Sequence, residues 1–396
     1  MKGFPLLFSS LVLSASTSGA TPALHFDFGA GGNAAGHPLF DPGRGMGFEP
    51  GAPALFSVSV PEGNYRVILR FDSSRKLKHA RVLAEQRRLM LEDVGVSKAT
   101  ERSFVVNVRT ADLAPLPANA TGGTKVALKP RELGSATWDG ELTLEFAGDA
   151  VPRSVSIEPV DVPTLYLAGD STVTDQGVAP SASWGQMLPR FFSADMAIAN
   201  HAESGETLKS FVTELRLDKL LSRLASGDWV MIQFGHNDQK AQWPQTYADA
   251  ATTYRSWLRT YIAEVRRRGA TPILVTSPER RNFDDHGRIV PSLGEYPDAV
   301  RAVAREEGVA LVDLNPMSIR FYEALGPEVS PRAFADEGRD KTHHSEYGAY
   351  ALARMVVEGL RTADPQLTAG LVSHLAPDAG RFDPSHPSPP IIAKTP

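Results

Sequence analysis

A serine, a histidine and an aspartate occupy positions from which they could transfer an acyl group. Ser171 follows an apolar run and a glycine, whereas Asp340 and His343 lie near the carboxyl end as Asp-Lys-Thr-His. A serine hydroxyl becomes a nucleophile when a base accepts its proton, and imidazole is the usual base near neutral pH. A carboxylate can orient that imidazole and stabilise its charged form. These residue types therefore predict Ser171 as nucleophile, His343 as base and Asp340 as the partner of the base.

An acyl transfer also needs preformed donors for the oxyanion of its tetrahedral intermediate. The backbone N–H groups of Ser171 and Gly205 and the side-chain amide of Asn237 could supply three. Three neighbouring residues are expected to shape the site without taking part in the chemistry: Gly169, Asp170 and Gly235. Nothing in these residues calls for a metal or another cofactor.

Each of these residues also has a purely structural interpretation. Ser171 and the Asp-x-x-His sequence could cap helices. Gly205 could be a simple turn residue, and Asn237 could hold its own loop in an Asx turn. His344 is a rival base, but a shift of one residue should point it away from Asp340. His201 and His236 are expected in loops or in support of the site.

The elements that must position these residues alternate between strands and helices beyond Pro163. Apolar runs at residues 165–168, 196–199, 229–234, 272–277 and 310–314 predict strands, and amphipathic runs at 247–268, 297–307 and 345–360 predict helices. Such alternation is typical of a parallel sheet covered on both faces, in a flavodoxin-like doubly wound order. Most of the polar clusters follow strands, and we expect them all to converge on one rim of the sheet.

The amino-terminal third is predicted to form an all-β sandwich of the jelly-roll type. Short alternating runs at residues 24–28, 55–60, 65–71, 87–91, 104–108, 142–146 and 155–157 predict its strands, with 55–60 and 65–71 as a hairpin. We find no catalytic constellation here, so residues 161–375 are expected to contain the whole site. Trp138 could stack on a sugar ring or belong to the core. Two prolines near residues 158–163 suggest a stiff linker.

The first twenty residues predict that the protein is exported. The first twenty residues carry Lys2, an apolar run and small residues ending at Ala20, which predicts a signal peptide and a secreted or periplasmic protein. No run is long enough to span a membrane. A net charge of −5 without a basic run makes nucleic acid an unsuitable partner, and the absence of cysteine leaves packing to stabilise the fold. We divide the chain into a signal peptide (1–20), a sandwich (21–160), a catalytic domain (161–375) and a Pro-rich tail (376–396).

Four blocks together resemble the SGNH, or GDSL-like, hydrolase family. They are Gly169-Asp-Ser-Thr172, Gly205, Gly235-His-Asn-Asp238 and Asp340-Lys-Thr-His343. Thr172 and the following Trp184-Gly-Gln186 are similar to the rhamnogalacturonan acetylesterase branch. The resemblance implies the same catalytic and oxyanion roles. The sandwich, with Phe26-Asp-Phe-Gly29, resembles galactose-binding-like jelly rolls.

One departure from the family pattern concerns the substrate. Glu206 and Thr207 stand where fungal members of the branch have arginine and serine, so the sequence does not define which residues contact the sugar.

We expect a secreted serine carbohydrate esterase that removes acetyl groups from plant cell-wall polysaccharide, with rhamnogalacturonan as first choice and an acetylated polysaccharide or oligosaccharide as partner. The alternatives are another polysaccharide deacetylase such as an acetylxylan esterase, a small-ester lipase or esterase, or a sugar-binding module on an inactive hydrolase. Long acyl chains are disfavoured because the loops are polar and carry Glu206, Asp238, Gln239 and Lys240.

Overall fold

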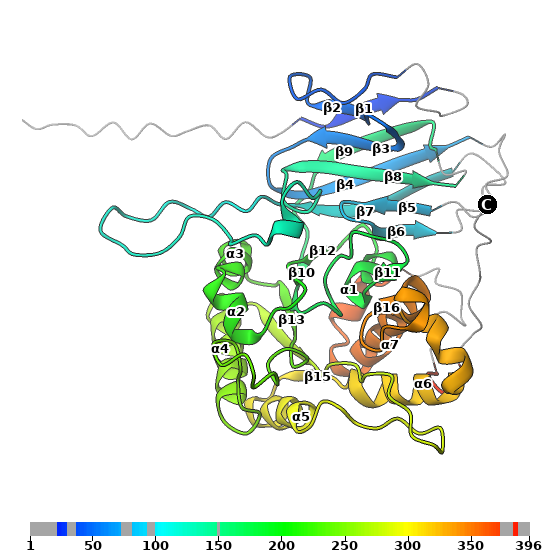
Figure 1. Ribbon diagram of the computed structural model, residues 1–396. Helices are drawn as coiled ribbons and strands as arrows, with labels where there is room; N and C mark the ends of the chain where they lie inside the picture. The colour runs from blue at the N-terminus through cyan, green and yellow to red at the C-terminus, as the bar shows by residue number, and fades with distance from the viewer. Residues whose placement is uncertain are drawn as a thin grey trace, which may run out of the picture.

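Two antiparallel sheets lie above an α/β unit in the computed structural model (Figure 1). The structure describes residues 22–29, 37–72, 81–92, 100–148, 151–372 and 383–386. The expected signal peptide lies outside these residues, as does the expected Pro-rich tail apart from 383–386. No helix within the described ranges has the length and apolar character to cross a bilayer.

The two antiparallel sheets pack face to face around an apolar core. One contains, in spatial order, β1 (Leu24–Asp27), β9 (Ser154–Pro159), β4 (Gly63–Phe71) and β7 (Thr100–Val108). The other contains β2 (Met46–Glu49), β3 (Ala52–Ser59), β8 (Glu141–Ala147), β5 (Arg81–Ala84) and β6 (Arg88–Glu92). Alternate residues such as Val67 and Leu69 of β4 meet Leu142 and Leu144 of β8 in that core. This pattern suits the predicted sandwich, whereas its jelly-roll topology and its boundary at residue 160 stay predictions.

The predicted hairpin between residues 55–60 and 65–71 is wrong. β3 pairs with β2 and β8, whereas β4 pairs with β7 and β9 in the opposite sheet. The intervening residues, 60–62, carry the chain from one sheet to the other. Both strands have an apolar face, and these faces gain more burial by facing each other across the core than by pairing edge to edge.

The α/β unit contains a parallel sheet of five strands, as the sequence predicted. Its order is β12 (Ala197–Asn200), β10 (Thr164–Gly169), β13 (Trp229–Gln233), β14 (Thr271–Val275) and β15 (Ala310–Val312), which is the flavodoxin-like 2-1-3-4-5 arrangement. The interior strand β10 is buried throughout, with Leu165 and Leu167 in the core on one face and Tyr166 and Ala168 in the core on the other. A strand buried on both faces must be covered by two layers of helices.

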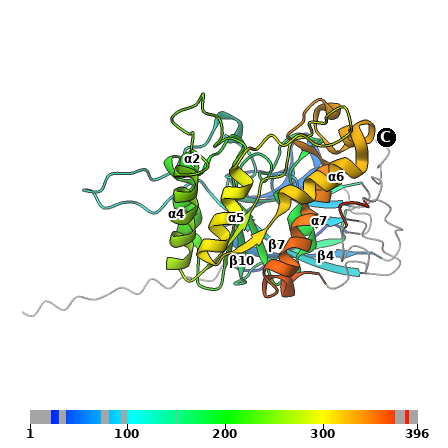
Figure 2. The same cartoon turned by 90° about the horizontal axis from the view of Figure 1, so that it is seen from below.

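Helices cover both faces of this sheet (Figure 2). One layer contains α2 (Leu208–Thr213), α3 (Arg216–Arg223), α4 (Thr253–Arg267) and α5 (Tyr296–Glu307). The other contains α1 (Trp184–Met187), α6 (Leu314–Val329) and α7 (Glu346–Ala363). The sequence did not predict the short helices α1, α2 and α3. It also did not predict α6, whose pattern is interrupted by a kink at Gly326 and Pro327. The predicted helix at 247–268 begins only at Thr253.

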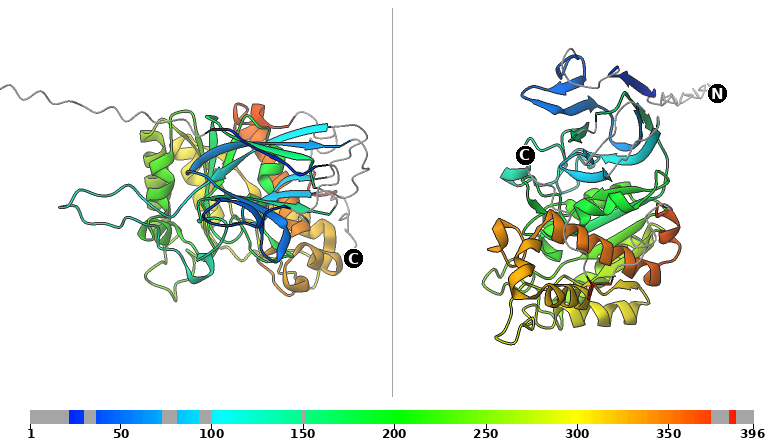
Figure 3. Two further views of the ribbon diagram at one scale, coloured as in Figure 1. Left: turned by 90° about the horizontal axis from the view of Figure 1, so that it is seen from above. Right: turned by 90° about the vertical axis from the view of Figure 1, so that its right-hand side faces the viewer.

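Charged side chains join the sandwich to the α/β unit. The right-hand view of Figure 3 shows the sandwich above the α/β unit. Arg88 of β6 pairs with Asp175 at 2.7 Å, and both side chains are at most 3% exposed. Glu62 pairs with Lys219 and Arg223 of α3, each at 2.7 Å. Removing one partner of a buried pair leaves an uncompensated charge, at a cost of about 3–5 kcal/mol. The sandwich is therefore anchored to the unit below it.

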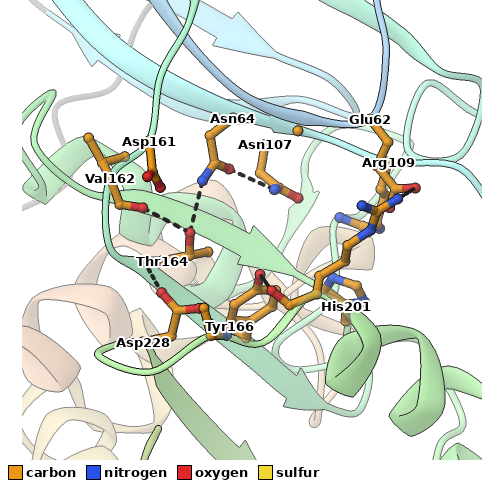
Figure 4. Close-up of a pocket in the computed structure, with 13 residues that line it drawn as sticks. Glu62, Asn64, Asn107, Arg109, Asp161, Val162, Thr164, Tyr166, His201 and Asp228 are labelled. Carbon is orange, nitrogen blue, oxygen red and sulfur yellow. Dashed lines mark hydrogen bonds and ion pairs between the residues drawn. The ribbon is translucent and has the colours of Figure 1, made fainter. Parts of the chain in front are cut away.

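A polar cavity of about 180 Å³ lies at this junction (Figure 4). Asn64 of β4 donates to the Thr164 hydroxyl at 2.9 Å and accepts from Asn107 of β7 at 2.8 Å. Thr164 begins β10, at the end of the strand opposite to Ser171. The cavity thus belongs to the junction between the two units and not to the predicted site.

Candidate active site

Ser171 stands on a tight turn at the carboxyl end of β10. The turn needs glycine at position 169, because an added Cβ would lie 2.6 Å from the Val173 side chain and 3.0 Å from the Gln233 carbonyl. Asp170 closes the turn by accepting from the backbone N–H and the hydroxyl of Thr172, at 3.0 and 2.9 Å. The serine hydroxyl is thereby presented at the rim of the sheet, as the sequence predicted.

A continuous line of hydrogen bonds joins the three residues of the predicted triad. The Ser171 Oγ lies 2.8 Å from His343 Nε2, and His343 Nδ1 lies 2.7 Å from Asp340 Oδ2. Asp340 Oδ1 accepts from the backbone N–H groups of Thr342 and His343, at 2.7 and 2.9 Å. Burial alone would raise the pKa of Asp340, but these bonds from His343 and Thr342 outweigh it and lower the pKa. Asp340 therefore stays ionised beside the imidazole.

The neighbouring His344 points into the protein. Its Nε2 lies 2.7 Å from the Tyr322 hydroxyl, and the residue is 1% exposed in the short strand β16 (His344–Ser345), which pairs with β11 (Ser181–Ala182). Burial, followed by the nearby charge of His343, lowers the pKa of His344 to about 3. The structure therefore brings His343, and not His344, to Ser171.

The loop after β13 presents the side-chain amide of Asn237. Its Oδ1 accepts from Lys240 Nζ at 2.7 Å, and its Nδ2 donates to the Glu206 carbonyl at 3.0 Å. One Nδ2 hydrogen is left for a substrate. Asp238 supports this loop by accepting from the backbone N–H groups of Leu208 and Gly235, each at 2.9 Å, and burial raises its pKa to about 7.

The loop after β12 carries Gly205, whose φ of +85° favours glycine. The next side chain, Glu206, is fully buried beneath this loop. It accepts from Ser210 Oγ at 2.6 Å and pairs with Lys129 and, at 3.5 Å, with Arg216. Burial, only partly offset by these two cations, raises the pKa of Glu206 to about 7.

The polar-loop argument against long acyl chains needs correction for two of its four residues, whereas Gln239 and Lys240 are partly exposed. Glu206 and Asp238 both have fully buried side chains, so neither lines the surface that a substrate meets. Their carboxylates hold the loops together instead. The position of arginine in fungal members is thus occupied here by a residue that faces the interior.

Two other histidines and Trp138 are buried and do not belong to the triad. His236 Nδ1 lies 3.3 Å from Asp170 Oδ2, so it contacts the nucleophile turn from behind. His201 is buried between the rings of Tyr166 and Trp138, and burial, with Arg109 next in effect, holds its pKa well below the usual range. Trp138 is itself buried, and the Arg109 guanidinium covers its ring at 4.4 Å. Its ring therefore has no open face for a sugar.

Sequence reasoning missed the residues that hold the loops in place. Lys240 was visible only as a polar loop residue, although its spacing of three from Asn237 was a usable signal. Two further residues had no signal in the sequence. Lys129 and Arg131 lie in the connection between β7 and β8, yet both donate to the Ser204 carbonyl, beside Gly205.

Comparison with known proteins gives matches to the α/β unit alone and matches to most of the chain. Residues 167–350 match the GDSL-like lipase/acylhydrolase family. Rhamnogalacturonan acetylesterase RhgT from Bacillus subtilis is 41% identical over 222 residues, which are 53% of this chain and 94% of RhgT. Probable rhamnogalacturonan acetylesterase YesY from the same organism is 35% identical over 211 residues, 52% of this chain and 97% of YesY.

A wider match includes the amino-terminal sheets. The crystal structure of protein YxiM from Bacillus subtilis covers 88% of this chain and 100% of its own, with a TM-score of 0.50 and 25% sequence identity. The same protein, described as an uncharacterized esterase, aligns over 312 residues at 28% identity. The combination of sandwich and α/β unit is thus shared with another bacterial protein.

Proposed function

Because the chain belongs to the GDSL-like lipase/acylhydrolase family, whose members hydrolyse esters, we propose that it is a serine esterase that removes acetyl groups from a polysaccharide. The observation that carries this proposal is the unbroken line of hydrogen bonds from Asp340 through His343 to Ser171. It supplies an oriented base within 2.8 Å of a hydroxyl at the rim of the sheet.

The reaction takes place in two halves at the same serine. Ser171 Oγ attacks the acetyl carbonyl carbon while its proton moves to His343 Nε2. The tetrahedral intermediate collapses, the bond to the sugar oxygen breaks, and that oxygen takes the proton from His343 Nε2. Water then attacks the acetyl-Ser171 ester and gives a proton to His343 Nε2. Release of acetate returns that proton to Ser171 Oγ.

The charge that develops on the carbonyl oxygen is stabilised by three donors. They are the backbone N–H of Ser171, the backbone N–H of Gly205 and the free hydrogen of Asn237 Nδ2. Their positions are set before the substrate arrives, so they require no reorganisation during the reaction. Asp340 keeps a proton on His343 Nδ1 and stabilises the imidazolium that forms on each transfer.

A pectic polymer, with rhamnogalacturonan as first choice, suits the surroundings of the site. RhgT and YesY carry that substrate in their names. Three cationic side chains lie on the flanking loops. Lys240 contacts Asn237, Arg280 donates to the His236 carbonyl, and Arg281 donates to the carbonyl of residue 338. Positive charge favours a polymer that bears uronate carboxylates.

Export through the predicted signal peptide would give a secreted or periplasmic enzyme access to plant cell-wall polymers. A galactose-binding-like role for the sandwich, over residues 21–160, completes the proposal. The alternative substrates are acetylated xylan and small esters. A sugar-binding module without activity is the alternative outside enzymes, and the intact line from Asp340 to Ser171 speaks against it.

Acetate release from a panel of acetylated polysaccharides tests the proposal. We expect the full chain to release acetate from rhamnogalacturonan faster than from xylan, and Ser171→Ala to release none above background. Faster release from xylan would replace the pectic substrate. Equal release by the wild type and Ser171→Ala would refute the serine mechanism, and no release from any polymer or aryl acetate would refute the esterase itself.

A further inference from the structure

The connection between β7 and β8 leaves the sandwich and runs along the α/β unit. We call residues 109–140 the β7–β8 segment, which Figure 1 shows in cyan beside α3. Ala127 N donates to the Glu214 carbonyl at 3.0 Å, and Glu132, in the short helix η1 (Pro130–Glu132), pairs with the buried Arg216 of α3. The segment is therefore fastened to the unit that carries Ser171.

Two cationic side chains of this segment meet at one backbone carbonyl. Lys129 Nζ donates to the Ser204 oxygen at 2.9 Å, and Arg131 Nη2 donates to the same oxygen. Arg131 also donates from Nε to Glu203 Oε1 at 2.7 Å. Charged donors make stronger hydrogen bonds than neutral ones, so this carbonyl is firmly held.

The Ser204 carbonyl belongs to the same peptide unit as the Gly205 N–H. In a planar trans peptide the C=O and N–H bonds point in opposite directions. Fixing the carbonyl therefore fixes the direction of the N–H. No residue that the structure describes accepts from the Gly205 N–H, which is thus available to a substrate. Hydrogen bonds at the carbonyl also polarise the peptide and strengthen its N–H as a donor.

We infer that Lys129 and Arg131 are positioning residues for the reaction at Ser171: they hold the Ser204–Gly205 peptide so that its N–H is directed at the oxyanion. This inference rests on the proposed function, and it differs from the expectation that residues 161–375 contain the whole site. The β7–β8 segment supplies part of the support for the oxyanion site, from more than 70 residues earlier in the chain.

Turnover of an aryl acetate by the full-length chain gives the first test. Deleting an oxyanion donor lowers kcat by about a hundred- to thousandfold. Misdirecting one should cost less, so we expect kcat to fall roughly tenfold in Lys129→Met and in Arg131→Met, with KM changed by less than about threefold. Lys129→Arg keeps a charged donor and should restore at least about a third of the wild-type kcat.

Lys125→Met is the matched control, because Lys125 lies on the same segment but pairs with the exposed Asp112. It should keep the wild-type kcat. An equal loss in Lys125→Met, or kcat within twofold of the wild type in both Lys129→Met and Arg131→Met, would overturn the inference.

A double variant separates the carbonyl contact from charge balance. Lys129 also pairs with the buried Glu206, so Lys129→Met leaves a carboxylate with one partner fewer. Lys129→Met with Glu206→Gln removes that imbalance while the contact to Ser204 remains lost. We expect the double variant to fold at least as well as Lys129→Met and to stay about tenfold slow. Return to the wild-type kcat would assign the effect to charge balance and overturn the inference.

Binding of methylboronic acid gives a readout that does not depend on turnover. Its tetrahedral adduct with Ser171 places an oxygen where the oxyanion forms, so its Kd should rise in Lys129→Met and Arg131→Met by about the factor lost in kcat/KM. Unchanged Kd values would contradict the inference. A wild type that binds the boronic acid but releases no acetate would refute the proposed function, while the ratios of Kd would still test the positioning role.

Discussion

The side-chain amide of Asn237 is held in one orientation by two neighbours. Substitution of Asn237 therefore tests the oxyanion site directly. Lys240 donates to its oxygen at 2.7 Å, and its nitrogen donates to the Glu206 carbonyl at 3.0 Å. Asn237→Ala removes the remaining donor. Asn237→Asp keeps the shape and the contact with Lys240 but presents an oxygen acceptor where negative charge develops.

The expected effect on turnover is much larger than the effect on folding. One oxyanion donor contributes about 2.7–4 kcal/mol to the transition state, so kcat of Asn237→Ala should fall by about a hundred- to thousandfold. KM should change only a few fold, because little charge is present on the ground-state carbonyl. The two hydrogen bonds lost with the amide should lower the free energy of unfolding by about 1–3 kcal/mol.

Turnover of an aryl acetate and the melting temperature should be measured on the same preparations. In Asn237→Asp the bond from the Lys240 ammonium becomes an ion pair with a carboxylate, so the melting temperature should fall less than in Asn237→Ala while kcat is at least as low. Lys240→Met should lower kcat by about tenfold, since the Asn237 amide keeps its N–H donor but loses one of the two hydrogen bonds that orient it. Asn237→Ala with a lower melting temperature and normal turnover of the folded protein would refute an oxyanion role.

Three further predictions concern the triad, its neighbour and a buried acid. Ser171→Ala should lower turnover by roughly three orders of magnitude or more in a folded protein, and adding His343→Ala should lower it little further, because the residues act as a unit; additive losses in a kinetic cycle would contradict this. In denaturant titrations, the free energy of unfolding of His344→Ala should be about 1–3 kcal/mol lower than that of the wild type, because the His344 ring is buried and bonded to Tyr322. The variant should keep most of its turnover. Loss of turnover in His344→Ala with normal turnover in His343→Ala would refute the assignment of the base. Burial raises the pKa of Asp238 to about 7, so between about pH 4 and 7 the folded chain holds a proton that an unfolded aspartate has lost. The contribution of Asp238 to stability is therefore lost as the pH rises, and the stability of the wild type minus that of Asp238→Asn should decrease from pH 4 to 7; an increase would contradict the raised pKa.

Local features of the chain were sufficient to predict the parallel sheet and the candidate site. An apolar run that ends in Gly169 predicts a buried strand and a sharp turn, and Ser171 follows at a fixed offset. The spacing of three between Asp340 and His343 is also local, so the bond between their side chains depends on only one turn of backbone. Strands that alternate with helices leave few possible connections, because right-handed crossovers are strongly preferred. Periodicity and spacing therefore determined the order of the strands and the place of the polar blocks.

Only the tertiary structure decided which surfaces meet. It put β3 and β4 in opposite sheets, because each has an apolar face that is buried by stacking. β8, which pairs with β3, and β9, which pairs with β4, both come from distant parts of the chain. It buried Glu206, which reads as a surface residue in the sequence, because cations from the β7–β8 segment and α3 offset its charge. It also placed Lys129 on the Ser204 carbonyl. Contacts of this kind join residues far apart in sequence, and nothing in the local pattern of either partner encodes them until the two units pack together.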